Sequence, residues 1–151
     1  MTGVALYYPP PKESLRSGTS TPNPTPRHQE LKDCRLLLAE DDPDVSDVLR
    51  RALTRLGYDV DLRANCEALF DGLSARPDVV VLDVGFSSPS GGFEVCRRLR
   101  GAGNQVPVLM LMDRATGIDR VVARDSGADE CLVKPFRLGD LVRCIPTLLQ
   151  L

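Results

Sequence analysis

Four consecutive apolar residues, Val79 to Leu82, end abruptly at the carboxylate of Asp83. A run this short and continuous, with three β-branched residues, is typical of a strand buried on both faces of a parallel sheet. In an open parallel sheet, ligands bind beyond the carboxyl ends of the strands. Asp83 is therefore expected where a functional site would lie. An aspartate that only leaves a strand to begin a turn is the alternative, and this stretch alone does not separate the two.

Strand-like runs alternate five times with helical patterns along the chain. This alternation predicts an α/β fold: a five-stranded parallel sheet of order 2-1-3-4-5, flavodoxin-like and doubly wound, with helices on both faces. Charged residues alternate with apolar ones in the second strand, which predicts an edge strand. Pro146 is expected to kink or shorten the last helix. The expected strands are 35–39, 60–64, 79–83, 107–112 and 131–133, and the expected helices are about 43–56, 66–75, 92–100, 118–127 and 138–149.

The first 33 residues differ in composition from the rest of the chain. They hold six of the twelve prolines and many Ser and Thr residues, and they have little apolar surface to bury. Residues 1–33 are therefore predicted to be a disordered tail, followed by one domain over 34–151. The only histidine, His28, lies in this tail, where no catalytic or metal role is expected for it.

Composition excludes several kinds of function. The net charge is -2 without a basic cluster, which argues against direct nucleic-acid binding. No apolar run is long enough to cross a bilayer and no secretory signal is evident, so a cytoplasmic protein without a membrane partner is expected. The five cysteines form no CxxC pair and are odd in number. They argue against a zinc site or a disulfide framework, and are expected to act as small buried apolar side chains.

Carboxylates gather where the first and third strands end. With the order 2-1-3-4-5 these strands are neighbours, so Glu40, Asp41 and Asp83 converge, and Lys134 joins them from the fifth strand. Each pair of carboxylates within a few ångström repels by roughly 3 to 4 kcal/mol at an effective dielectric near 20. Such a site requires a cation, and oxygen ligands of this kind suit Mg²⁺. The chemistry that follows is phosphoryl transfer to an aspartate nucleophile.

Four motifs together resemble a response-regulator receiver domain of two-component signalling: LLLAEDDP, VVVLD, PVLMLM and GADECLVKPF. The resemblance covers about residues 35–149. It implies a phosphorelay protein without substrate turnover, whose partner is a sensor histidine kinase or a phosphotransfer protein. It also implies a cis peptide bond between Lys134 and Pro135. The implied site consists of Asp83 as phosphoacceptor, Lys134 as phosphoryl contact, and Glu40, Asp41, Asp83 and the backbone carbonyl of Gly85 as ligands of Mg²⁺.

The chain departs from the receiver pattern at the positions that report phosphorylation. Met112 stands where receivers carry Thr or Ser, and its thioether cannot donate a hydrogen bond. Asp113 follows in place of a small residue, and Cys131 replaces the expected aromatic side chain. Asp113 could oppose the phosphoryl group, point away from it, or join the metal ligands. Asp42 is expected to be a helix cap rather than a ligand.

Three functions remain open from the sequence. The first is a phospho-accepting receiver with an atypical switch. The second is a pseudo-receiver, which would bind partner proteins independently of phosphorylation. The third is an Asp-nucleophile phosphatase, which Gly85 disfavours because that class carries a second aspartate there. The downstream target is not readable, the chain is either a stand-alone receiver or a fragment, and a homodimer through 118–127, 131–133 and 138–149 is a further possibility.

Overall fold

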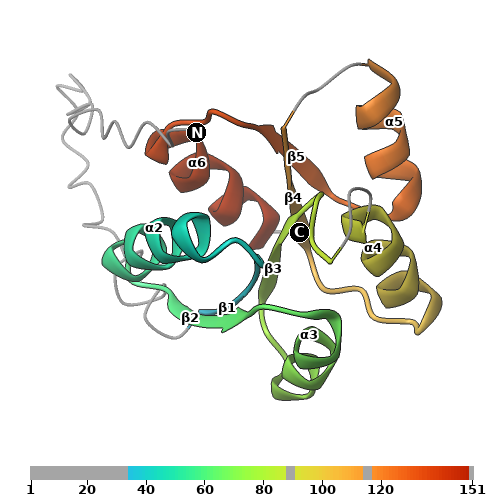
Figure 1. The fold of residues 1–151 in the computed structure, drawn as a ribbon, viewed down its shortest axis with the longest axis horizontal. Helices are drawn as coiled ribbons and strands as arrows, with labels where there is room; N and C mark the ends of the chain where they lie inside the picture. The colour runs from blue at the N-terminus through green and yellow to red at the C-terminus, as the bar shows by residue number, and fades with distance from the viewer. Residues whose placement is uncertain (1–33, 88–90, 114–116, 150–151) are drawn as a thin grey trace, which may run out of the picture.

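The computed structural model describes residues 34–87, 91–113 and 117–149, so the expected disordered tail lies outside the described residues. Strands and α-helices alternate along this part of the chain, and Figure 1 shows their arrangement. The strands are β1 (Arg35–Ala39), β2 (Asp59–Arg63), β3 (Val79–Asp83), β4 (Val108–Met112) and β5 (Glu130–Val133). The helices are α2 (Pro43–Arg55), α3 (Cys66–Gly72), α4 (Gly91–Gly101), α5 (Gly117–Ser126) and α6 (Leu138–Leu149), and a 3-10 turn, η1, spans Leu73–Ala75.

All five strands are parallel and lie in the order β2-β1-β3-β4-β5. This confirms the predicted topology and places β2 at an edge of the sheet. In β3, neighbouring side chains enter two separate cores: Val79 and Val81 belong to one, Val80 and Leu82 to the other. Both faces of β3 are therefore covered, which is why its sequence is continuously apolar.

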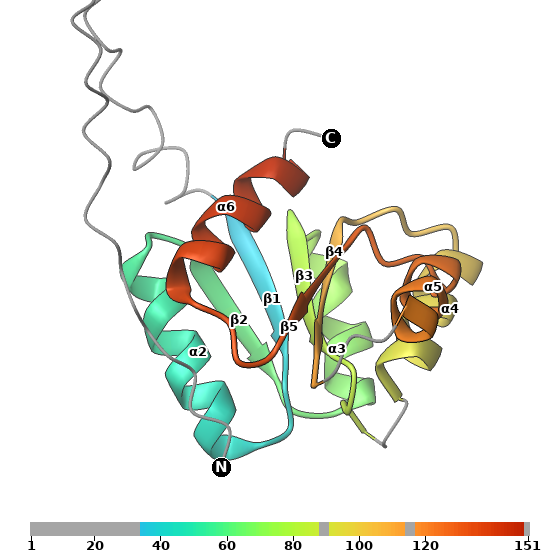
Figure 2. The same ribbon diagram turned by 90° about the horizontal axis from the view of Figure 1, so that it is seen from above.

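Helices cover both faces of the sheet, as Figure 2 shows. Leu49 of α2 and Ile145 of α6 pack in the first core, whereas Leu69 of α3, Val95 of α4 and Ala123 of α5 pack in the second. The doubly wound prediction is thus confirmed. Cys34 and Cys96 are buried, and the other three cysteines are half-buried. None of the helices in the described ranges is long and apolar enough to cross a membrane.

The helix after β2 ends earlier than expected, and the last helix contains a proline. The helix expected over 66–75 is α-helical only to Gly72; it continues as η1, which ends at Arg76, where the backbone is left-handed with a φ of 54°. α6 spans the expected range, Leu138–Leu149, with Pro146 inside it, so the proline does not shorten the helix. Ile145 and Leu148, on either side of the proline, are buried in the first core. Their burial offsets the hydrogen bond that the proline removes.

Gly92 lets the first turn of α4 lie against the backbone that follows Asp83. A Cβ atom at Gly92 would lie 2.6 Å from Cα of Val84 and 2.7 Å from the carbonyl oxygen of Asp83. The N–H of Gly92 also donates a hydrogen bond to the carbonyl of Val84, at 2.8 Å. The helix therefore fixes the backbone at the end of β3.

Gly92→Ala is expected to lower the free energy of unfolding by about 2 kcal/mol, because backbone atoms must move to admit the methyl group. Urea denaturation followed by circular dichroism measures this change. Gly101→Ala is the matched control in the same helix, since a Cβ there meets nothing within 4 Å. We expect the control to match the wild type or exceed it by up to about 1 kcal/mol. Equal stability of both variants would contradict a steric role for Gly92.

Candidate functional site

Three ionisable side chains lie buried together at the carboxyl end of the sheet. Glu40 follows β1, Asp83 ends β3 and Lys134 follows β5. Glu40 is 3% exposed, Asp83 is 6% exposed, and the side chain of Lys134 is 7% exposed. Charged groups are almost never buried this deeply unless they are paired or bind a ligand. Strand order thus brings together residues that are far apart in the sequence, as the sequence predicted.

Lys134 is the cation at the centre of this group. Its Nζ donates a hydrogen bond to Oδ1 of Asp83 and lies 4.0 Å from Oε2 of Glu40. Burial acts to lower the pKa of Lys134, but the hydrogen bond and charge of Asp83, with the nearby carboxylates, raise it overall. Lys134 therefore carries its charge at neutral pH. The Lys134-Pro135 peptide is cis, as the sequence resemblance predicted.

The loop after β3 holds the carboxylates in place. Oδ2 of Asp83 accepts a hydrogen bond from the N–H of Gly85 at 2.9 Å. The fully buried side chain of Phe86 anchors the loop in the second core. Oδ2 of Asp41 accepts from the N–H of Ser87 at 3.0 Å. Sequence reasoning missed Ser87, because its contribution is a backbone N–H oriented by a φ of 73°, for which the sequence carries no signal.

Glu40 has one oxygen without a hydrogen-bond donor. Oε1 accepts from the N–H of Asp42 at 3.1 Å, but Oε2 is buried and has no hydrogen-bond partner among the described residues. Burial, with a further contribution from the charge of Asp83, raises the pKa of Glu40 to about 7. A buried carboxylate oxygen that accepts no hydrogen bond is costly. It is a natural ligand for a cation.

The donor set fits a magnesium ion. Within the described ranges, no group of three or more His, Cys, Asp or Glu side chains is arranged to hold a metal ion by itself. Mg²⁺ does not require one, since it usually takes one or two carboxylates and completes its shell with water and phosphate oxygens. Glu40 offers an oxygen that accepts no hydrogen bond, and the carboxylates of Asp41 and Asp83 carry charges that act on Glu40. Asp42 does not contribute: as predicted it caps α2, with Oδ1 accepting from the N–H groups of Asp44 and Val45.

Met112, Cys131 and Asp113 were singled out in the sequence, and of these Asp113 lies near Lys134. Met112 is 2% exposed and packs in the second core, and the half-buried Cys131 packs against the same core. Both thus lie on the sheet face covered by α3, α4 and α5. The side chain of Asp113 is 68% exposed, and its Oδ1 lies 3.8 Å from Nζ of Lys134. The structure therefore adds a third carboxylate around Lys134.

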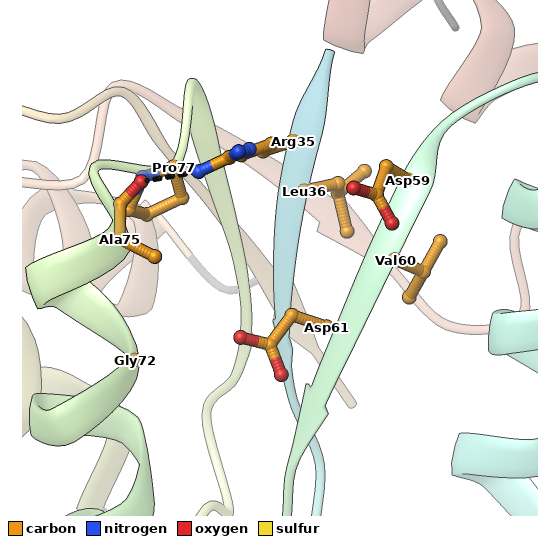
Figure 3. A pocket seen from close by; sticks show the side chains of 8 residues that line it. All are labelled: Arg35, Leu36, Asp59, Val60, Asp61, Gly72, Ala75 and Pro77. Atoms are coloured by element: carbon orange, nitrogen blue, oxygen red, sulfur yellow. Dashed lines mark hydrogen bonds between the residues drawn. The ribbon is translucent and has the colours of Figure 1, made fainter. Parts of the chain in front are cut away.

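A surface pocket of about 340 Å³ lies elsewhere, near the amino ends of β1, β2 and β3. Figure 3 shows Arg35 and Asp59 on its wall, with the Arg35 guanidinium donating a hydrogen bond to the carbonyl of Ala75 at 3.0 Å. Asp61, also on the wall, pairs with Arg63. The pocket lies at the amino ends of the strands, whereas Asp83 lies at the carboxyl end of β3, so the pocket is separate from the site around Asp83.

Known proteins resemble this chain in sequence. The family model of the response regulator receiver domain matches residues 36–146. Response regulator MprA of Mycobacterium tuberculosis is 44% identical over 117 residues, which are 77% of this chain and 50% of that protein. MprA of Mycolicibacterium vanbaalenii is 41% identical over the same shares of both chains. The chain thus spans about half the length of these relatives.

Solved structures share the fold. A putative response regulator from Chloroflexus aurantiacus is 27% identical with a TM-score of 0.71, covering 78% of this chain and 98% of the other. The chemotaxis protein CheY4 of Vibrio cholerae has a TM-score of 0.70 at 24% identity, covering 76% of this chain and 98% of the other. At that identity the likeness concerns the fold alone.

Proposed function

Because this chain belongs to the response regulator receiver domain family of two-component signalling, we propose that it accepts a phosphoryl group on Asp83 with the help of Mg²⁺. Members of this family receive signals from histidine kinases or phosphotransfer proteins, are generally not enzymes that turn over a substrate, and generally bind Mg²⁺ at the phosphorylation site. The buried pair of Asp83 and Lys134 carries the proposal. It provides a nucleophile with a cation for the incoming phosphoryl oxygens.

In the proposed reaction, an oxygen of Asp83 attacks the phosphorus of the donor. A new O–P bond forms, the bond between phosphorus and the donor breaks, and its electron pair leaves with the donor. The N–H of Gly85 holds one oxygen of Asp83, and Lys134 Nζ moves from Asp83 onto the phosphoryl oxygens. Glu40, Asp41, Asp83 and the carbonyl of Gly85 would hold Mg²⁺. When bound, the ion supplies positive charge to the attacking carboxylate and the phosphoryl group.

The test is to incubate the full chain with acetyl phosphate and Mg²⁺ and to measure its intact mass. We expect the added mass of one phosphoryl group, and none when a chelator replaces Mg²⁺. Failure to form any adduct over a range of donor concentrations would contradict the proposal. An adduct that forms equally well in chelator would contradict the role of the metal.

A second candidate function is a pseudo-receiver that binds partners independently of phosphorylation. The observation that favours it is the burial of Met112, an apolar side chain at the position where the family pattern carries a hydroxyl. With Met112 in place of a hydroxyl residue and Cys131 in place of an aromatic one, this chain lacks the side chains that usually respond to a phosphoryl group on the aspartate. Partner binding that is the same for wild type and Asp83→Ala would support this candidate, whereas binding that follows phosphorylation would exclude it.

We propose that this chain acts in the cytoplasm and that its phosphodonor in the cell is a sensor histidine kinase or a phosphotransfer protein. A homodimer through α5, β5 and α6 is supported by Val121 of α5, which is 57% exposed. Val121→Glu is expected to shift any dimer toward monomer, because a charge in an apolar interface must be desolvated. Size-exclusion chromatography with light scattering, before and after phosphorylation, measures this. If the substitution leaves the molar mass of the dimer unchanged, α5 is not part of the dimer interface.

A further inference from the structure

Lys134 is shared by three carboxylates rather than held by one. Two of them, Asp83 and Glu40, are buried with it. The third, Asp113, is mostly exposed and lies 3.8 Å away through Oδ1. The site therefore contains an exposed carboxylate that attracts the ammonium group of Lys134 but is not part of the buried group.

The position of Asp113 follows from the pairing of β4 with β5. Met112 is the register partner of Val133, and the N–H of Lys134 donates to the carbonyl of Met112 at 2.7 Å. Asp113 is the next residue after Met112, so the sheet itself places its backbone beside that of Lys134. The pairing of β4 with β5 therefore fixes the distance between the two backbones, whatever conformations the side chains adopt.

We propose that Asp113 competes with the phosphoryl group for Lys134 and so shortens the life of phosphorylated Asp83. The inference rests on the proposed phosphorylation of Asp83 and concerns how long that state lasts. A phosphoryl group on Asp83 requires Lys134 Nζ to turn onto its oxygens. The charge of Asp113 attracts the same ammonium group and repels the phosphoryl oxygens. Both effects favour the unmodified carboxylate.

Loss of the phosphoryl group is a hydrolysis. Water attacks phosphorus, the O–P bond to Asp83 breaks with its electron pair returning to the carboxylate, and inorganic phosphate leaves. Repulsion from Asp113 is present while the group is bound and disappears when phosphate diffuses away. Because the carboxylate of Asp113 is exposed, water screens it, and the expected effect is modest.

The test compares the half-life of the phosphoryl group on wild type, Asp113→Asn and Asp113→Glu. Each protein is phosphorylated with acetyl phosphate and Mg²⁺, the donor is removed, and the remaining adduct is followed by intact mass. We expect Asp113→Asn to lengthen the half-life about two- to fivefold at low salt, the size typical of an exposed charge pair. Asp113→Glu keeps the charge and is expected to retain a half-life closer to that of wild type.

Ionic strength separates charge from packing. The difference between wild type and Asp113→Asn is expected to shrink at 1 M salt, where the Debye length is about 3 Å. A purely steric effect of the side chain would not depend on salt. Asp59→Asn, which neutralises an exposed acid at the start of β2, is the matched control and is expected to leave the half-life unchanged.

Three outcomes would overturn the inference. Equal half-lives of wild type and Asp113→Asn at low salt would exclude competition. A change that persists unaltered in high salt would assign the effect to packing. If neither protein forms an adduct, the proposed function itself fails and this inference fails with it, whereas adducts with equal lifetimes overturn only the role of Asp113.

Discussion

Asp83→Asn is expected to abolish the phosphoryl adduct completely. The amide of asparagine has nearly the shape of the carboxylate, but it is neutral and is a far weaker nucleophile. Its oxygen can still accept the hydrogen bond that the N–H of Gly85 donates to Asp83. The substitution therefore removes the nucleophile but retains the hydrogen bond from Gly85 that holds the loop. Intact mass after incubation with acetyl phosphate and Mg²⁺ measures the loss.

Two controls make this result specific. Asp59→Asn removes the same charge at an exposed position at the start of β2, and it is expected to retain the full adduct. Thermal unfolding of Asp83→Asn, followed by circular dichroism, shows whether the variant is folded. An undiminished adduct in folded Asp83→Asn would assign the phosphoryl group to another carboxylate, and the neighbouring Asp41 and Asp113 would then be tested in turn.

The second large effect is a loss of stability as Glu40 ionises. In the folded protein, burial raises its pKa from 4.5 to about 7. Folding therefore favours the protonated form of Glu40. Its contribution to the free energy of unfolding is fully present below pH 4.5 and is lost as the pH rises through 7. A shift of this size corresponds to about 3 kcal/mol. Lys134 does not titrate in this range, because its pKa is raised.

Urea denaturation from pH 4.5 to 8 in the presence of a chelator measures this dependence. Glu40→Gln cannot ionise, so its free energy of unfolding is expected to be about 3 kcal/mol less sensitive to pH over this range. Glu94→Gln, at an exposed position of α4, is expected to follow the wild-type curve. Mg²⁺ is expected to restore stability to wild type at pH 8 but much less to Glu40→Gln, because the ion requires the ionised carboxylate. If the free energies of unfolding of wild type and Glu40→Gln depended on pH in the same way, burial would not disfavour the ionised form of Glu40.

The order of strands and helices could be predicted from the sequence, because it rests on local patterns. Apolar runs such as Val79 to Leu82 and helical spacing after Pro43 each depend on residues close together in the chain. The cap at Asp42 and the edge position of β2 were likewise local signals. The cost of Pro146 is also local, whereas the burial of Ile145 and Leu148 that offsets it is tertiary and could not be read from the sequence.

The convergence of Glu40, Asp83 and Lys134 needed only the strand order, so the sequence alone could anticipate which side chains meet. It could not determine how they meet. The partners of each oxygen depend on backbone positions set by contacts between distant segments: the N–H of Ser87 on Asp41, α4 against Val84, and β5 in register with β4. That register also places Asp113 beside Lys134. Local propensity therefore determined the fold and the candidate residues, while the packing of distant segments decided which oxygen of Glu40 accepts no hydrogen bond and which carboxylates share the lysine.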